Sequence, residues 1–386
     1  MRKFVEKLRK ERKDLIGQVI SMKRRYEGKL DLLDLSVGSP NLPPPIWVVE
    51  TMKDSMKVRR YHGYPPKFGA EELFDSVMRW YKRRFGVNIP SHDNLIITPG
   101  IKEAIFDTLV SILNENEKVL VPDPGYPTYS DALIFAGAER IPYNPEEKDE
   151  EVLREIETMM EREKPSAIVL NYPHNPTGRL PSFETLSKIV MLARKNGMKI
   201  LSDMAYSEIF FENESHSVFE MMGDFKDTVE FLSFSKTYNM AGWRIGIMVG
   251  DAELMSLVKT YRSVKHSGVF YPIQLSAKSA LDDTPEEYYE DLRTIYRRRR
   301  DILCEELEKG GFSFSRPQGS IYVWAKIPSN FLDMDTMEFV KLMLERTGIL
   351  VFPGEIFGKN GKKKVRFSLV EEEERLREVG ERLKRL

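Results

Sequence analysis

The stretch AIVLNYPHNPTGRLPSFETLSKIVMLARKNGMKILSDMAY, residues 167–206, joins two short apolar runs through a polar turn and a helical pattern. Ser182 stands where the N-cap of that helix is expected, and Gly197 stands near its C-terminal end. Two short apolar runs with a helix between them are typical of a βαβ unit, whose parallel strands are buried on both faces. The stretch therefore predicts an α/β fold.

The same alternation of β-rich runs and helical segments extends from Asn94 to Gly250. It predicts a mostly parallel sheet that is covered by helices on both faces. Helices are expected at KEAIFDTLVSIL (102–113) and FETLSKIVMLARKNG (183–197). The expected strands are NLIIT (94–98), KVLVP (118–122), AIVLN (167–171), KILSD (199–203), VEFLSF (229–234) and RIGIMVG (244–250).

After about Tyr271 the alternation stops, and a long charged helical stretch leads to three strand-like runs and a closing helix. This order predicts a smaller α+β domain. The closing helix would bury one apolar stripe, made of Leu376, Val379, Leu383 and Leu386. The strand-like runs are SIYVWAKI (320–327), GILVFPG (348–354) and KVRFSL (364–369).

These patterns divide the chain into two domains. We expect a large domain over residues 46–275 and a small domain built from residues 1–45 and 276–386. The N-terminal segment, which ends in the proline-rich NLPPP, could pack on either of them. The sequence has no internal repeat.

The composition is that of a soluble globular protein, with 386 residues, 41% hydrophobic residues, 31% charged residues and a net charge of −1. This balance gives no electrostatic reason to expect a nucleic acid or an anionic membrane as partner. The basic run YRRRRD, residues 296–301, precedes a helical pattern, and we interpret it as a solvated helix face.

Cys304 is the single cysteine, so no disulfide can form within the chain, which favours a reducing compartment. The N-terminus is charged throughout and has no apolar signal core, so we expect a cytoplasmic protein. Many charged residues and few glutamines favour a heat-adapted source. The five histidines show no metal-ligand spacing, and we expect no metal.

Unusual polar and aromatic residues follow the predicted strands. Because ligands bind beyond the carboxyl ends of parallel strands, these residues would meet at one edge of the sheet. Each alone has an ordinary structural explanation, as a cap, a turn residue or a surface charge. Their shared position favours a binding site, and its members are Tyr126, Asn175, Asp203, Tyr206, Ser235 and Lys236.

The first turn of the helix that opens at Ile101 offers free N–H groups and a positive dipole end, which suit a phosphate. Arg244 would add a bidentate clamp, and Ser233 and Ser235 would add hydroxyl donors. Lys236 beside this phosphate site is suited to condense with an aldehyde, provided that burial and nearby cations lower its pKa.

The other members of the site fit the same ligand. Asp203 would keep a heterocyclic nitrogen protonated, which makes the ring an electron sink. Asn175 and Tyr206 would hydrogen-bond a phenolate oxygen, and Tyr126 would stack on the ring. Pyridoxal 5′-phosphate satisfies all of these roles and is the predicted cofactor.

At these residues the sequence resembles the class I and II aminotransferases of pyridoxal-phosphate fold type I, over nearly the whole chain. It is most similar to the branch with alanine, LL-diaminopimelate and aspartate aminotransferases. The resemblance lies in PGIKEA (99–104), DPGYPTY (123–129), NYPHNPTG (171–178), DMAY (203–206) and SFSKTYNMAGWRIG (233–246). It implies that Lys236, Asp203 and Tyr206 are catalytic. The cofactor contacts that it implies are Gly100, Ile101, Lys102, Tyr126, Asn175, Asp203, Tyr206, Ser233, Ser235, Lys236 and Arg244.

Three further motifs concern the substrate and the assembly. PGEIFGKNGKKKVRFSL (353–369) resembles the family motif that puts Arg366 on the substrate α-carboxylate. LSVGSPNLPPP (35–45) implies that the Gly38 backbone approaches that carboxylate together with Asn175. YPPKFG (64–69) implies that Tyr64 reaches the phosphate in the other subunit of a homodimer with shared sites. The family often has a cis peptide before the proline of NPTG, which makes Asn175–Pro176 a candidate.

The resemblance implies a ping-pong transamination, in which Lys236 anchors the cofactor and then acts as general base. We expect small or acidic amino donors such as alanine, aspartate or glutamate, with a 2-oxo acid as acceptor. Lys102 stands where some aspartate-using relatives bind a distal carboxylate, although a role in the phosphate loop explains it equally well.

Two other functions are compatible with these motifs. One is a pyridoxal-phosphate lyase of the carbon–sulfur β-lyase or aminocyclopropane-carboxylate synthase type. The other is a non-enzymatic pyridoxal-phosphate regulator. Regulators of that type have an additional N-terminal DNA-binding domain, and only about 35 residues precede LSVGSP here, so this reading is disfavoured.

Overall fold

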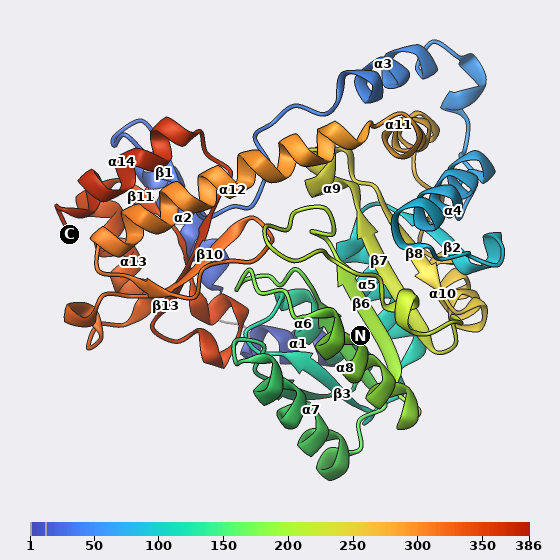
Figure 1. Ribbon diagram of the computed structural model, residues 1–386, viewed down its shortest axis with the longest axis horizontal. Coiled ribbons are helices and arrows are strands. Elements are labelled where there is room, and N and C mark those ends of the chain that lie inside the picture. Colours follow the sequence, from blue (N-terminus) through green and yellow to red (C-terminus); the bar gives the residue numbers. More distant parts are fainter. Residues whose placement is uncertain (1, 12–13) are drawn as a thin grey trace.

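A seven-stranded sheet forms the centre of the larger part of the molecule (Figure 1). The computed structural model describes residues 2–11 and 14–386. All neighbouring strands are parallel except β8, which runs antiparallel to both of its neighbours. In sheet order the strands are β2 (Leu95–Thr98), β8 (Gly246–Gly250), β7 (Thr228–Ser233), β6 (Lys199–Met204), β5 (Ala167–Asn171), β3 (Lys118–Pro122) and β4 (Glu139–Tyr143). The predicted α/β sheet is confirmed.

Helices cover both faces of this sheet, so its strands read as continuous apolar runs. One face is covered by α5 (Ile101–Ile112), α6 (Pro127–Ala136) and α10 (Ala252–Ser263). The opposite face is covered by α4 (Glu71–Phe85), α7 (Asp149–Glu163), α8 (Phe183–Lys195) and α11 (Tyr271–Asp282). Outside these lie α3 (Ile46–Ser55), packed on α11, and the short α9 (Phe234–Thr237).

Local signals fix the ends of several elements. The Ser182 hydroxyl accepts a hydrogen bond from Thr185 N, so it caps α8 as predicted. Gly197 follows the C-cap of that helix with a φ of +65°. Strand β4 was not predicted, because its sequence ERIPY is charged and contains a proline. It forms the edge of the sheet and pairs only with β3, where these residue types are tolerated.

The smaller part of the molecule contains two further sheets. An antiparallel sheet has the order β12 (Phe352–Pro353), β13 (Lys364–Ser368), β10 (Tyr322–Lys326) and β9 (Ser313–Phe314). A parallel pair joins β1 (Leu33–Asp34) to β11 (Ile349–Leu350). The run GILVFPG, predicted as one strand, therefore serves two sheets, because the chain changes partners at Val351. The helices here are α2 (Leu15–Tyr26), α12 (Glu286–Lys309), α13 (Thr336–Thr347) and α14 (Glu373–Leu383).

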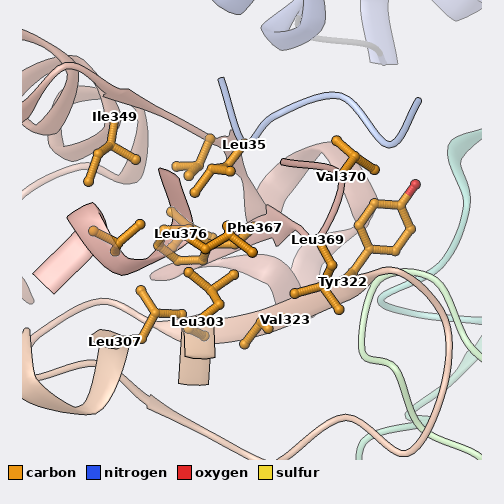
Figure 2. Close-up of a cluster of buried hydrophobic side chains, with 14 of the residues drawn as sticks. Leu35, Leu303, Leu307, Tyr322, Val323, Ile349, Phe367, Leu369, Val370 and Leu376 are labelled. Atoms are coloured by element: carbon orange, nitrogen blue, oxygen red, sulfur yellow. The ribbon is translucent and has the colours of Figure 1, made fainter. Parts of the chain in front are cut away.

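The core of this smaller part draws side chains from both ends of the sequence (Figure 2). Leu35 follows β1, Leu303 and Leu307 come from α12, and Phe367 comes from β13. The predicted stripe of α14 is confirmed, since Leu376, Val379 and Leu383 are buried and Leu386 packs against them.

The interpretation of YRRRRD as a solvated face is wrong. Tyr296, Arg299 and Arg300 are buried, and of this run's arginines only Arg298 is exposed. The long α12 runs between the two parts of the molecule and meets neighbours on several sides (Figure 1). Oxygens from neighbouring segments accept hydrogen bonds from these buried guanidinium groups: Arg299 Nη1 donates to Asn41 Oδ1 at 2.8 Å, and Arg300 Nη1 to Pro317 O at 3.0 Å.

The N-terminal segment contacts both parts of the molecule. Helix α1 (Arg2–Glu11) packs on α6 of the large sheet layer, whereas α2 and β1 join the smaller part. Residue 275, where the sequence suggests a domain boundary, lies inside α11, which packs on α3 and α4. In the described chain, none of the helices combines the length and apolar character that a membrane crossing requires.

Candidate active site

The predicted polar residues meet beyond the carboxyl ends of the central parallel strands. Asn171 ends β5 and pairs with Asp203 in β6, while Ser233 ends β7 and leads directly into α9 with Lys236. Neighbouring parallel strands place their ends side by side, so one loop after each strand contributes to one site.

Lys236 is held at the first turn after β7. Its Nζ donates a short hydrogen bond to the carbonyl oxygen of Gly38, which lies in the loop after β1. Burial lowers the pKa of Lys236, and the charges of Arg366 and Arg244 lower it further, while Tyr322 opposes them. The amine is therefore shifted towards its neutral, nucleophilic form.

The Asp203 carboxylate is fixed by two donors. Tyr129 Oη donates to Oδ2 at 2.6 Å, and Ala205 N donates to Oδ1 at 3.0 Å. Burial raises the pKa of Asp203 to about 6, and these two hydrogen bonds oppose the rise. A cationic nitrogen beside this carboxylate would lower its pKa again, because opposite charges stabilise each other at low dielectric.

A candidate anion-binding site, called the anion seat below, lies at the N-terminus of α5. Gly100 is its N-cap and makes no side-chain cap, so the first N–H groups keep their donor capacity. The φ of Gly100 is +87°, and a Cβ there would lie 2.5 Å from Arg244 Nη2. Ser233 Oγ accepts a hydrogen bond from Ser235 N at 3.2 Å, which leaves the Ser233 hydroxyl hydrogen able to donate.

Arg366 is the second buried cation of the site. It is 5% exposed; Nη1 donates to Asn175 Oδ1 and Nη2 to Ser36 O, each at 2.9 Å. Its Cζ lies 3.8 Å from the ring centroid of Tyr322 and 4.6 Å from that of Phe357. None of these neighbours is negatively charged. The positive charge of the guanidinium is therefore available to pair with an anionic ligand.

The aromatic members occupy different positions. Tyr126 is partly buried at the start of α6, and its ring makes an edge contact with Tyr129 at 5.8 Å. Tyr206 is buried, and its hydroxyl donates to the Tyr322 hydroxyl at 3.2 Å. Tyr64 is 93% exposed and does not reach the cluster within one chain.

The remaining predicted residues lie around the anion seat or in the loop after β5. Ile101 is partly buried and Lys102 is exposed in the first turn of α5. The Asn175–Pro176 peptide is cis, as are Asp123–Pro124 and Tyr172–Pro173. In residues 2–11 and 14–386, no cluster of histidine, cysteine, aspartate and glutamate has the make-up of a metal site.

Tyr129, Asn171 and Tyr322 contribute to the site and were not predicted. Tyr129 lies three residues after Tyr126 on α6, and this spacing could have placed it on the same face. Asn171 donates to Asp203 O at 2.9 Å and accepts from Asn175 N at 3.0 Å, which orders the loop after β5. Tyr322 lies in a separate strand, and only the strand register brings it to the site.

This donor set fits pyridoxal phosphate. Because Gly100 has no side chain, the Arg244 guanidinium can lie against the N-terminus of α5, where a Cβ would come within 2.5 Å of its Nη2. A lysine of lowered pKa stands near it, and a carboxylate held by Tyr129 suits the ring nitrogen. The buried Nε of Arg366 has no hydrogen-bond partner in the described chain, which leaves a donor available.

Known proteins are similar to this chain in sequence and fold. The family model for aminotransferase class I and II matches residues 31–383. The LL-diaminopimelate aminotransferase of Aquifex aeolicus is 37% identical over 366 residues, which cover 94% of this chain and 93% of that protein. The glutamate-pyruvate aminotransferase AlaC of Escherichia coli is 34% identical over 363 residues, covering 93% and 87%. A solved variant of Thermus thermophilus aspartate aminotransferase superposes with a TM-score of 0.86 at 27% identity, covering 97% of this chain and 96% of that one.

Proposed function

The chain belongs to the class I and II aminotransferases, and on this premise we propose that it takes the α-amino group from small or acidic L-amino acids. Aminotransferases of this family depend on pyridoxal phosphate, so the protein is a pyridoxal-phosphate enzyme that transfers amino groups to 2-oxo acids. The lyase alternative is not favoured, because the similar proteins bear aminotransferase names. The non-enzymatic regulator is set aside, because the similar proteins are named as aminotransferases.

The observation that carries α-amino acid binding in the proposal is that the buried Arg366 pairs with no carboxylate in the described residues. Its fork is held by Asn175 Oδ1 and Ser36 O, and its face lies on the Tyr322 ring. A substrate α-carboxylate would supply the missing negative charge and would be oriented by the bidentate fork. Gly38 lies beside this position, where any side chain would collide with the Tyr322 hydroxyl.

The other residues have complementary roles in the proposal. When bound, pyridoxal phosphate supplies an aldehyde for the amino group and a ring that withdraws electrons from Cα. Lys236 Nζ takes up the proton that leaves Cα, which its lowered pKa permits. Asp203 holds the positive charge of the ring nitrogen, and Tyr129 keeps the carboxylate in place.

The cofactor seat in the proposal uses the remaining predicted residues. Arg244, Ser233 and Ser235 hold the phosphate together with the backbone N–H groups of α5. Tyr126 would cover the ring, while Asn175 and Tyr206 would donate hydrogen bonds to its phenolate oxygen. The further cofactor-binding residues in this assignment are Gly100, Ile101 and Lys102.

Several relatives support the donor class. These relatives are glutamate-pyruvate, aspartate and LL-diaminopimelate aminotransferases. LL-diaminopimelate therefore joins alanine, aspartate and glutamate among the donors to be tested. The exposed Lys102 at the start of α5 remains a candidate for a distal carboxylate.

The proposed assembly is a homodimer with shared sites. Tyr64 is almost fully exposed in the single chain, although its motif resembles a phosphate-contacting segment. An exposed tyrosine of this kind suits a position at the phosphate of a second copy. We place the enzyme in the cytoplasm, where the thiol of the buried Cys304 stays reduced.

A single-turnover donor screen tests this function. The pyridoxal-phosphate enzyme is mixed with one amino acid and no acceptor, and pyridoxamine phosphate and 2-oxo acid are quantified by liquid chromatography. We expect one equivalent of each from alanine, aspartate, glutamate or LL-diaminopimelate, and slower formation from leucine and phenylalanine. Ammonia release without pyridoxamine phosphate would indicate elimination, and faster reaction of the large apolar donors would refute the donor class.

A further inference from the structure

Tyr322 contacts three residues of the site from one buried position. Its hydroxyl accepts from Tyr206 Oη at 3.2 Å, and its ring lies 3.8 Å from Arg366 Cζ. The same hydroxyl fills the space next to Gly38, where an added Cβ would lie 1.9 Å from it. Figure 2 shows the oxygen of Tyr322 pointing away from the surrounding apolar cluster.

The strand register fixes this position. In the antiparallel pair of β10 and β13, Trp324 lies opposite Arg366 and Tyr322 lies opposite Ser368. Residues two apart on a strand share a face, so Tyr322 and Arg366 are diagonal neighbours on one face. Tyr322 is a buried member of the hydrophobic cluster of the smaller part (Figure 2).

We propose that Tyr322 is a positioning residue that joins two halves of the site, its ring seating the Arg366 guanidinium and its hydroxyl orienting that of Tyr206. The proposal rests on the proposed function, in which Arg366 binds the substrate carboxylate and Tyr206 binds the cofactor. It adds that both groups are aligned by one side chain.

The ring holds the plane of the guanidinium. Asn175 and Ser36 accept hydrogen bonds from its edge, but edge contacts alone leave the plane free to tilt. The face of an aromatic ring attracts a cation and stops this tilt. Phe357 approaches the same guanidinium, with its ring centroid 4.6 Å from Cζ. The fork is thereby kept in one orientation for a carboxylate.

The hydroxyl acts on Tyr206 through a hydrogen-bond chain. A tyrosine hydroxyl has one hydrogen, so Tyr206 cannot donate to Tyr322 and to a cofactor oxygen at once. When Tyr206 donates to the cofactor, the Tyr322 hydrogen can turn to the Tyr206 oxygen and strengthen that donation.

The surroundings shift the pKa values of the two phenols in opposite directions. Burial raises the pKa of Tyr206, and its neighbour Tyr322 raises it further. Burial opposes ionisation of Tyr322 as well, but the charges of Arg366 and Lys236 and the hydrogen bond from Tyr206 outweigh it, so its pKa is lowered. The charge of Asp203 also raises the pKa of Tyr206.

Two substitutions separate the two roles. Tyr322→Phe removes only the hydroxyl, and Tyr322→Leu also removes the ring. Tyr296→Phe is the matched control, because Tyr296 lies buried in the same core and its hydroxyl has no hydrogen-bond partner among the described residues. All three variants are purified with pyridoxal phosphate, and their thermal unfolding is compared with that of the wild type.

The first readout is the pH midpoint of the visible absorbance of bound pyridoxal phosphate. Tyr322→Phe should raise it by about half a unit or more, because weaker donation by Tyr206 leaves the phenolate oxygen more basic. The second readout is carboxylate binding, followed by KM for alanine and by the absorbance change with propionate. Tyr322→Leu should weaken both about tenfold, whereas Tyr322→Phe should change them less than about twofold.

Each outcome decides the proposal. An unchanged midpoint in Tyr322→Phe would overturn the role of the hydroxyl, even if the leucine variant did not fold. Equal carboxylate binding by Tyr322→Leu and Tyr322→Phe would overturn the role of the ring. A Tyr296→Phe variant that moved either readout would show a merely structural effect of core tyrosines. If the proposed function itself fails, the wild type shows no carboxylate response, which distinguishes the two failures.

Discussion

The Tyr129 hydroxyl donates a 2.6 Å hydrogen bond to Asp203 Oδ2 in the buried floor of the site. Burial raises the pKa of Asp203 to about 6, and Tyr129 and Ala205 N limit the rise. Below about pH 6 the carboxyl group of the apoenzyme is protonated, and above it the group is ionised. Tyr129 therefore determines how far down in pH the site keeps its negative charge.

Tyr129→Phe should shift the pH dependence of cofactor binding upwards. Affinity of the apoenzyme for pyridoxal phosphate should fall as the pH drops through about 6, because a protonated Asp203 no longer attracts the ring nitrogen. Without the Tyr129 hydrogen bond the midpoint should rise by about one unit. Fluorescence titrations between pH 5 and 8 measure it. Tyr143→Phe is the control, since it loses a buried hydrogen bond to Val169 O instead; equal shifts in both variants would contradict the assignment.

Lys236→Ala should retain the cofactor but lose turnover. The anion seat at α5 and the Asp203 carboxylate remain, so pyridoxal phosphate should still bind without a covalent link. Loss of the amine should lower kcat by roughly 10³-fold or more, because nucleophile and general base are lost together. Methylamine added to the variant should restore part of the activity. Turnover near that of the wild type would show that the reaction does not need Lys236.

Arg366→Lys should lower the activity with α-amino acids specifically. The lysine keeps a positive charge but cannot make the fork to Asn175 and Ser36 or lie flat on the Tyr322 ring. We expect kcat/KM for alanine to fall about 100-fold. The discriminating comparison is a slow amine donor without a carboxylate, such as benzylamine, whose rate should change little. A similar fall for both donors would mean that Arg366 only supports the fold.

Most of the fold could be predicted from apolar periodicity. The six predicted strands of the central sheet are present, because strands buried on both faces read as continuous apolar runs. The edge strand β4 was missed, since an edge tolerates the charges and the proline of ERIPY. The two short strands around Val351 could not be separated, because a change of sheet leaves no periodic signal.

The site was predictable where its residues follow strands in one local motif. Lys236, Asp203 and Asn175 are of this kind, and the structure brings them together with Arg366. Tyr322 escaped prediction because its neighbours are distant in the chain, and its role depends on the register of β10 against β13. A tyrosine in an apolar strand reads as a core residue, and the ring of Tyr322 is indeed in the core.

Arg299→Ala should destabilise the protein much more than Arg298→Ala. Arg299 is 1% exposed, and its Nη1 donates to Asn41 Oδ1 at 2.8 Å and to Leu369 O at 3.2 Å. Its removal would take this donor from the buried Leu369 carbonyl and open a cavity beside α12. The expected loss is about 2–3 kcal/mol of unfolding free energy, against less than about 0.5 kcal/mol for the exposed Arg298. Urea unfolding followed by circular dichroism measures both, and equal midpoints would restore the solvated-face interpretation of this run.

Subunit mixing tests whether Tyr64 serves the site of a second copy. Tyr64 is 93% exposed in one chain, so Tyr64→Ala should leave the fold and its thermal stability unchanged. It should still impair phosphate binding if the residue completes a neighbouring site. Lys236→Ala disables the other component of the same site. In hybrid dimers of the two variants, one site then combines the intact Lys236 of one chain with the intact Tyr64 of its partner.

Each variant alone should therefore be nearly inactive, and an equal mixture refolded together should recover about one quarter of the wild-type activity. Half of the randomly formed dimers are hybrids, and each hybrid has one intact site out of two. The control mixture combines Lys236→Ala with a chain that carries both substitutions, which cannot rebuild a site. Recovery in the test mixture alone supports the shared site. No recovery, with dimers shown by light scattering, would place Tyr64 outside the partner's site.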